Sequence, residues 1–172
     1  MKLARVETLF ADAGHKDYNF CKITTDDATI VGWSEYSAGQ ALPGVAALIQ
    51  SMGASLVGQD PRAVERISQR LRQPLAGSAY GGVAYQAVAA IENALIDIKA
   101  KAAGLSVCEL LGGPIHSTLP VYWTQCGNCR LDDGWNIGGG PNSGKTPVRS
   151  YDDVVKIAEE AVSKVSFDIY IL

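Results

Sequence analysis

A long stretch with helical periodicity, GGVAYQAVAAIENALIDIKAKAAGLSVCELLGG from Gly81 to Gly113, restricts the possible folds of this chain most strongly. Its apolar residues recur every three or four positions, which predicts one apolar face along a helix of about five turns. The residues of that face are Ala84, Ala87, Val88, Ile91, Leu95, Ile98 and Ala102. Asp97 and Lys101, on the polar side, are expected to form an acid-to-base pair in the favoured order. The pattern predicts a half-buried helix and not a membrane span.

The same stretch indicates how the helix packs and where it ends. Ala87, Ala90 and Ala94 place little side chain on the buried side, so a neighbouring element can approach the helix backbone closely. Gly104 stands where a residue in the left-handed conformation would end the helix, and residues 108–111 are expected to form a short turn after it.

The segments around this helix predict strands and further helices. Alternating and β-branched residues predict a first strand, Leu3–Phe10, and then a hairpin, Phe20–Thr25 and Thr29–Tyr36, with its turn at Asp26-Asp27-Ala28. A helix is expected to open at Pro43-Gly44, with Val45, Leu48, Ile49, Met52 and Leu56 as its apolar face and Gly53 fraying its end. Asp60 and Pro61 are a capping residue and a first-turn proline, which predict the start of the next helix.

The residues after Pro114 predict a different organisation. Leu119–Trp123 and Phe167–Leu172 are expected to be short apolar strands, and residues 125–149, rich in Gly, Asn and Asp, are expected to form a long loop. Ser150 to Asp153 predict a capping box at the start of another helix. Its buried face is expected at Val154, Ala158, Ala161 and Val165.

Three segments carry a family resemblance in the expected order. They are the helix motif A-x-x-x-x-E-N-A-L-x-D-I-K-A-K-A-x-G-L-x-V-x-E-L-L-G-G, the hairpin KITTDDATIVGWSEY (Lys22–Tyr36) and the helix start LVGQDPRAVERISQRL (Leu56–Leu71). Together they resemble the N-terminal capping domain of the mandelate racemase and muconate-lactonising enzymes of the enolase superfamily. The resemblance covers residues 1–125 well and residues 148–172 loosely. The family usually has glycine where Ala28 stands, and alanine resists a positive φ there.

The resemblance implies an α+β fold with two domains. Residues 1–116 are expected to form a three-stranded antiparallel meander followed by helices, which is an enolase-like N-terminal capping domain. Residues 117–172 are expected to form the first strands and helix of a truncated (β/α)8 TIM barrel.

The resemblance also implies a chemistry. Full-length members use Mg²⁺, held by carboxylates on barrel strands, to stabilise the enediolate formed when a base removes the proton α to a carboxylate. The chain is therefore expected to be the N-terminal part of an acid-sugar dehydratase or hydroxy-acid racemase, with a small carboxylate or acid sugar as substrate. The catalytic residues and the metal site are expected beyond Leu172, so the chain alone should hold no cofactor and be inactive. Ile171 stands where many members have a lysine.

Candidate substrate contacts follow from the family's closing loops and its first barrel strand. The resemblance implies that residues 11–19 and 37–44 close over the barrel mouth, and Trp123 ends the predicted first barrel strand. His15, Tyr18, Tyr36 and Trp123 are the predicted substrate-binding residues, and no metal ligand is predicted. Each also fits a purely structural position.

Composition limits the partners. With 47% hydrophobic and 19% charged residues and a net charge of -3, the chain is expected to be a globular cytoplasmic protein that binds neither nucleic acid nor membranes. The N-terminus lacks the apolar core of a signal peptide, and the four cysteines are too scattered for a disulfide framework. A homo-oligomer is expected.

Two motifs and one further hypothesis offer alternatives. Gly139 to Thr146 fits the P-loop pattern, but polar residues precede it and Pro147 follows, so specific nucleotide binding is not expected. Cys126 and Cys129 form a C-x-x-C pair without a second pair, which favours free thiols over zinc. The chain could also be a non-catalytic association module, since a capping domain has a core of its own.

Overall fold

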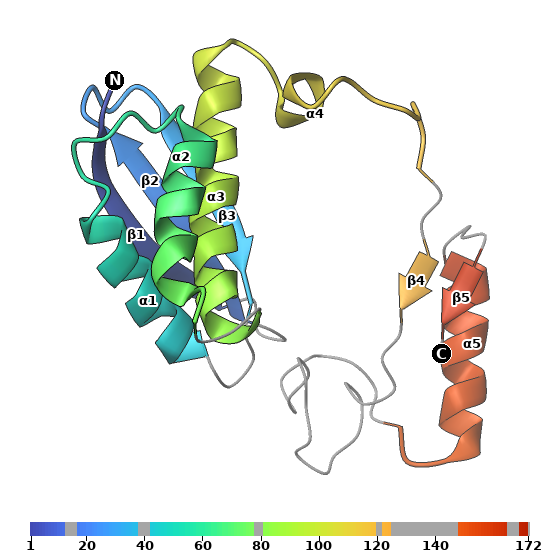
Figure 1. The fold of residues 1–172 in the computed structure, drawn as a ribbon. Coiled ribbons are helices and arrows are strands. Elements are labelled where there is room, and N and C mark those ends of the chain that lie inside the picture. The colour runs from blue at the N-terminus through green and yellow to red at the C-terminus, as the bar shows by residue number, and fades with distance from the viewer. Residues whose placement is uncertain are drawn as a thin grey trace. The chain divides into compact units, whose positions relative to one another are not determined.

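The computed structural model describes residues 1–12, 17–37, 42–77, 81–119, 122–124, 148–164 and 169–171. The elements are β1 (Leu3–Asp12), β2 (Asp17–Thr25), β3 (Val31–Tyr36), α1 (Leu42–Ala54), α2 (Val64–Arg72), the 3-10 turn η2 (Gln73–Leu75), α3 (Gly82–Ala102), α4 (Val107–Leu110), β4 (Tyr122–Thr124), α5 (Tyr151–Lys164) and β5 (Ile169–Ile171) (Figure 1). They form two compact units. The first contains Met1–Ala11 and Tyr18–Pro114, and the second contains Asp12–Asp17 and Ile115–Leu172.

The first unit is an antiparallel sheet in the order β1-β2-β3 with α1, α2 and α3 on one side of it (Figure 1). This confirms the predicted meander followed by helices. Cys21 lies opposite Ser34 and Ile23 opposite Gly32, so alternate residues of β2 and β3 face the helices. β2 begins at Asp17, earlier than predicted, and Tyr18 is therefore a strand residue and not a loop residue.

The turn between β2 and β3 places Ala28 at a φ of 55°, in the left-handed region. Asp27 holds the turn, because its Oδ1 accepts hydrogen bonds from the Thr25 hydroxyl at 2.6 Å and from the Thr29 amide at 3.1 Å. These bonds lower the pKa of Asp27, the Thr25 bond most. The Cβ of Ala28 makes this conformation unfavourable for alanine.

Replacing Ala28 by glycine is expected to stabilise the chain by about 0.5–1 kcal/mol, because the relief of strain exceeds the added entropy of the unfolded chain. Urea unfolding gives the free energy. Ala89→Gly, at an exposed position inside α3, is the matched control and should destabilise by about 1 kcal/mol. An equal loss in both variants would contradict the strained turn.

Helix α3 forms the centre of the core. Its buried residues are Ala87, Val88, Ala90, Ile91, Ala94, Leu95, Ile98 and Ala100. The predicted apolar face is thus confirmed from Ala87 to Ile98, whereas Ala102 is exposed. At the C-terminus the Leu105 amide donates to the Ala100 carbonyl, the Gly104 amide donates to the Lys101 carbonyl, and Gly104 has a φ of 71°. This is the predicted left-handed helix end.

Gly53 stands one residue before the end of α1, where a helix end is predicted, and it has a packing role that the prediction does not include. Gly53 is buried against β1, and a Cβ added there would lie 2.5 Å from the Val6 Cβ. The glycine allows α1 to approach the sheet, because any side chain at this position would overlap with Val6. Leu56 is fully buried, but it lies beyond the end of α1.

The predicted start of α2 at Asp60-Pro61 is wrong, because the helix begins at Val64. Asp60 Oδ1 accepts from the Arg62 amide at 3.0 Å, and its carboxylate also pairs with the Arg62 side chain at 2.8 Å. These bonds, the side-chain ones most, lower the pKa of Asp60 to about 2. Asp60 therefore caps a turn before the helix, and Pro61 is buried beneath that turn.

The second unit pairs β4 with β5 in parallel, with Trp123 opposite Tyr170 and α5 between the two strands in sequence. α5 starts with the predicted capping box: the Ser150 amide donates to Asp153 Oδ2 at 3.0 Å and the Asp153 amide donates to Ser150 Oγ at 3.3 Å. The predicted buried face needs correction, since Val154 is 38% exposed and Ile157 is 7% exposed.

Candidate functional site

One end of the first sheet collects the element ends that border the predicted closing loops. β1 and β3 end there and β2 begins there, because neighbouring strands are antiparallel. α3 runs antiparallel to β3: Ser34 Oγ donates to the Ala90 carbonyl at 2.6 Å, while Lys101 Nζ donates to the Val31 carbonyl at 2.8 Å. α1 also starts at this end, since a Cβ added at Gly44 would lie 3.9 Å from the Val83 Cγ1, near the start of α3. We call this the loop end of the sheet.

Two of the predicted substrate-binding residues stand at the loop end, but on opposite faces. Asn19 is the register partner of Tyr36, and both are buried on the face that carries the helices. Tyr18 precedes Asn19, so its side chain belongs to the other face. His15 lies outside the described residues, and Trp123 belongs to β4 in the second unit.

Tyr36 occupies a core position. It is 7% exposed and belongs to the hydrophobic cluster of the first unit. Burial raises the pKa of its phenol, with a further contribution from the neighbouring Cys21. Burial also raises the pKa of the Cys21 thiol to about 12, although a hydrogen bond with Ser34 opposes the shift. Both groups are therefore neutral at neutral pH, and the role of Tyr36 as a substrate contact stays a prediction.

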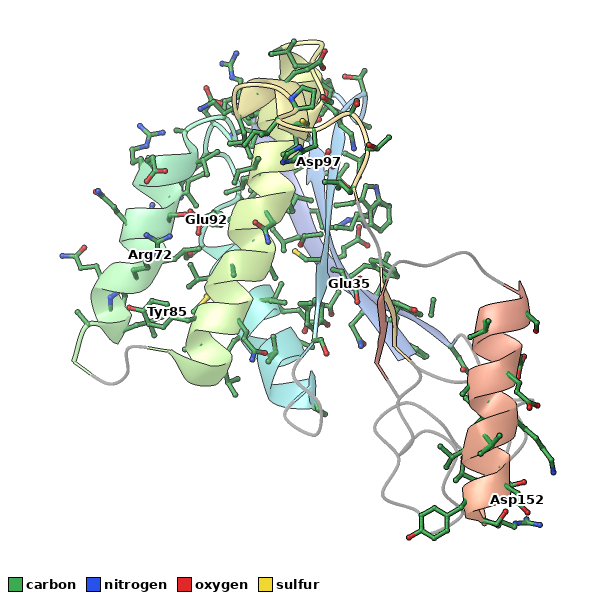
Figure 2. The ribbon with its side chains drawn as sticks, turned by 90° about the vertical axis from the view of Figure 1, so that its right-hand side faces the viewer. Glu35, Arg72, Tyr85, Glu92, Asp97 and Asp152 are labelled. Atoms are coloured by element: carbon green, nitrogen blue, oxygen red, sulfur yellow. The ribbon has the colours of Figure 1, made fainter. Side chains whose placement is uncertain are left out.

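Three charged residues of α3 are engaged in ion pairs. Glu92 binds Arg72 of α2 at 2.7 Å, and Asp97 binds Lys101 at 2.7 Å, which confirms the predicted pair (Figure 2). Asp97 Oδ2 also accepts a hydrogen bond from the Trp33 amide at 2.9 Å. The sequence pattern missed this contact with β3, because helical spacing reports only neighbours within the helix.

The opposite face of the sheet carries an aromatic group that the sequence reasoning did not single out. Trp33 is 42% exposed, the Phe20 ring meets it edge-on at 6.4 Å, and the Lys22 ammonium lies 5.5 Å from its ring centre. The alternation of β2 and β3 could have predicted that these residues share a face. Phe20 and Lys22 both contact the Trp33 ring, and Glu35, the register partner of Phe20, belongs to the same face.

The described residues do not fit a magnesium site. No three His, Cys, Asp or Glu side chains converge in the parts of the chain that the structure describes. At the start of α5, the Asp153 carboxylate accepts hydrogen bonds from the Ser150 hydroxyl and from the Arg149 amide, which lower its pKa. A hard cation needs several convergent oxygen ligands, whereas Asp153 Oδ2 caps the helix and Asp153 Oδ1 lies 3.6 Å from the Lys156 ammonium.

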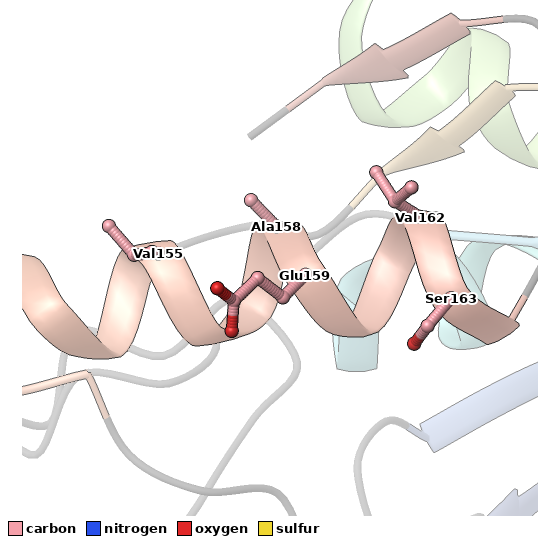
Figure 3. A pocket seen from close by; sticks show the side chains of 5 residues that line it. All are labelled: Val155, Ala158, Glu159, Val162 and Ser163. Carbon is pink, nitrogen blue, oxygen red and sulfur yellow. The ribbon is translucent and has the colours of Figure 1, made fainter.

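A hollow runs along one face of α5 in the second unit (Figure 3). Its described lining residues are Val155, Ala158, Glu159, Val162 and Ser163. All come from one helix, and Glu159 is the only carboxylate among them. This arrangement brings no acid-base pair or nucleophile together and supports no reaction by itself.

The motifs at Gly139–Thr146 and Cys126–Cys129 lie outside the described residues, so their interpretations stay predictions. Within the described part, Cys21 and Cys108 are free thiols. None of the helices in that part is long and apolar enough to cross a membrane.

Curated relatives are similar to 60–70% of this chain. It is 36% identical over 124 residues to the D-galactarolactone cycloisomerase of Agrobacterium fabrum, which covers 70% of this chain and 32% of the relative. It is 39% identical over 104 residues to the D-galactonate dehydratase of Pectobacterium atrosepticum, which covers 60% of this chain and 26% of the relative. The chain thus spans about a third or less of the length of these relatives.

The solved structures extend the similarity to both units. A mandelate racemase/muconate lactonizing protein from Paracoccus denitrificans PD1222, complexed with magnesium, superposes with a TM-score of 0.78 at 27% identity, over 98% of this chain and 41% of that one. The family model for the mandelate racemase / muconate lactonizing enzyme N-terminal domain matches residues 2–112. The first unit, from its meander to the glycine-capped α3, is that domain, and the chain belongs to the mandelate racemase / muconate lactonizing enzyme family of the enolase superfamily.

Proposed function

We propose that this chain serves as the N-terminal part of a magnesium-dependent enzyme that removes the proton α to the carboxylate of a small acid, most specifically an acid-sugar dehydratase or hydroxy-acid racemase. The family match over residues 2–112 carries this proposal. The names of the relatives, a galactonate dehydratase and a galactarolactone cycloisomerase, support an acid sugar as the substrate class. The magnesium in the Paracoccus denitrificans structure supports the same metal here.

We propose that the chain contains two domains, a capping domain at residues 1–116 and the start of a (β/α)8 barrel at residues 117–172. The boundary between the two compact units in this part of the sequence, after Pro114, supports this division. The parallel pair β4 and β5, with α5 between them in sequence, has the connectivity of one barrel repeat. The bound metal would supply charge stabilisation, and the described residues offer it no ligand set. By analogy with the family, we assign the metal and the catalytic acids and bases to later strands of the barrel.

The capping unit would act at the loop end of its sheet. His15, between β1 and β2 in sequence, Tyr18 in β2 and Tyr36 at the end of β3 are the proposed substrate contacts from this unit. Trp123 in β4 is the proposed contact from the barrel. Cytoplasmic location and homo-oligomer formation complete the proposal, and the free thiols of Cys21 and Cys108 agree with a reducing compartment.

Proton exchange tests the function. The 172-residue chain is compared with a chimera in which residues 1–112 replace the matching domain of the Pectobacterium atrosepticum D-galactonate dehydratase. Both are incubated with magnesium and a panel of sugar acids and hydroxy acids in deuterated buffer. We expect the chimera alone to exchange the α-proton. Magnesium-dependent exchange by the 172-residue chain would contradict the division of labour.

Variants of the chimera test the loop end. His15→Ala and Tyr18→Phe are expected to lower kcat/KM by about tenfold, the cost of one lost hydrogen bond to a charged substrate. Thr29→Ala, at the opposite end of the sheet, is the control and should leave kcat/KM unchanged. If the chimera folds with its capping domain docked on the barrel but exchanges no proton, the result would favour the alternative, a non-catalytic association module. That alternative rests on the hydrophobic cluster, which closes within the first unit.

A further inference from the structure

The free edge of the first sheet is covered in an unusual way. Among the strands that the structure describes, β3 is an edge strand, because the sheet order is β1-β2-β3. An edge strand presents backbone amides and carbonyls that can pair with a strand of another molecule. Two of these groups on β3, the Trp33 amide and the Val31 carbonyl, are bound instead by side chains of α3.

Asp97 and Lys101 provide these side chains. The Trp33 amide donates to Asp97 Oδ2 at 2.9 Å, Lys101 Nζ donates to the Val31 carbonyl at 2.8 Å, and Lys101 Nζ also lies 2.7 Å from Asp97 Oδ2. In a parallel ladder, each bonded residue of an added strand faces one residue of the edge strand. Its amide donates to the carbonyl of the residue before that one, and its carbonyl accepts from the amide of the residue after it. The Asp97 carboxylate and the Lys101 ammonium reproduce this pattern, because the Val31 carbonyl and the Trp33 amide flank Gly32.

The packing of α3 makes this arrangement possible. A Cβ added at Gly32 would lie 2.2 Å from the Ala94 carbonyl oxygen, so the absent side chain lets the helix backbone reach the strand. Ser34 fixes the same approach, because its hydroxyl donates to the Ala90 carbonyl at 2.6 Å. Asp97 and Lys101 follow on the next turns of the helix and reach the backbone groups at the edge.

We propose that Asp97 and Lys101 form a side-chain cap that takes the place of one residue of a neighbouring strand, and that this cap prevents β3 from pairing with β3 of a second copy of this chain. The pair thus has a role beyond helix stability. It satisfies two backbone groups of the edge, the Trp33 amide and the Val31 carbonyl, and its side chains occupy the space beside them that a second strand would need. Removing the cap should expose the Trp33 amide to solvent and permit edge-to-edge association.

The test uses the whole chain with the substitutions Asp97→Ala and Lys101→Ala combined. At low protein concentration we expect the Trp33 amide to exchange with deuterium about tenfold faster than in the parent, which corresponds to the loss of a hydrogen bond to a charged group. Sedimentation velocity over a range of concentrations should show association beyond that of the parent. At high concentration the Trp33 amide should become protected again as the edges pair.

Two further variants separate the cap from general damage. Asn93→Ala combined with Lys99→Ala removes two exposed side chains from the same helix and should leave both measurements at parent values. Asp97→Asn keeps an acceptor for the Trp33 amide and should keep that amide slow. If the double alanine variant loses its helical circular dichroism, Lys101→Met replaces it in the sedimentation test. Unchanged Trp33 exchange in Asp97→Ala/Lys101→Ala, or parent-like sedimentation of the folded variant, would overturn the proposal.

Discussion

Replacing Ile91 by aspartate is expected to unfold the first unit. Ile91 is 0% exposed and lies in the middle of α3, where the helix contributes to the hydrophobic cluster with residues of the sheet, α1 and α2. An unpaired carboxylate at this position costs several kcal/mol, against a total stability of about 5–15 kcal/mol for a domain. Far-ultraviolet circular dichroism at 25 °C should show loss of helical signal, or thermal melting should show a large fall in the midpoint of the cooperative transition.

The matched control is Asn93→Asp, which introduces the same charge on the exposed side of the same helix. This change should alter the free energy of unfolding by about 0.5 kcal/mol or less, as expected for a surface substitution. A cooperative melt of Ile91→Asp near the parent temperature would mean that the buried face of α3 is assigned wrongly.

Periodicity predicted the elements whose stability comes from one buried face. The spacing from Ala87 to Ile98 predicted the core side of α3, and Gly104 predicted its end, because both depend on local geometry that the sequence carries directly. The start of α2 was missed because Asp60 and Pro61 have the side chains of a helix start but are used in a turn. A helix start and a turn differ here only in tertiary packing, because Pro61 is buried in the turn.

Contacts between distant elements limited the prediction of the site. Tyr18 and Tyr36 were assigned to one substrate site, yet the register that pairs Asn19 with Tyr36 places them on opposite faces. That register depends on strand pairing, which a residue list does not give. The packing role of Gly53 escapes prediction for the same reason, since Val6, whose side chain leaves no room for a Cβ there, belongs to β1. The chemistry itself could not be located, because the described residues contain no convergent set of metal ligands.

Gly32 shows the same dependence on a distant neighbour, and it supports the second large prediction. Gly32→Ala should destabilise the chain by about 3 kcal/mol, because the new methyl group would lie 2.2 Å from the Ala94 carbonyl oxygen and 2.6 Å from the Ile98 Cγ1. The first of these atoms is backbone of α3, so a rotamer change cannot relieve the overlap. The helix must move away from β3, and the hydrogen bond from Ser34 to the Ala90 carbonyl would weaken as well.

Gly77→Ala is the control for this substitution. A Cβ added at Gly77 meets no atom within 4 Å, and alanine lowers the entropy of the unfolded chain, so this variant should be neutral or more stable by up to about 1 kcal/mol. Urea unfolding of both variants gives the difference, and Trp33 amide exchange in Gly32→Ala should rise with it, because Asp97 moves with the helix. If the two variants unfold within about 0.5 kcal/mol of each other, the close contact between α3 and β3 is not the constraint that keeps glycine at position 32.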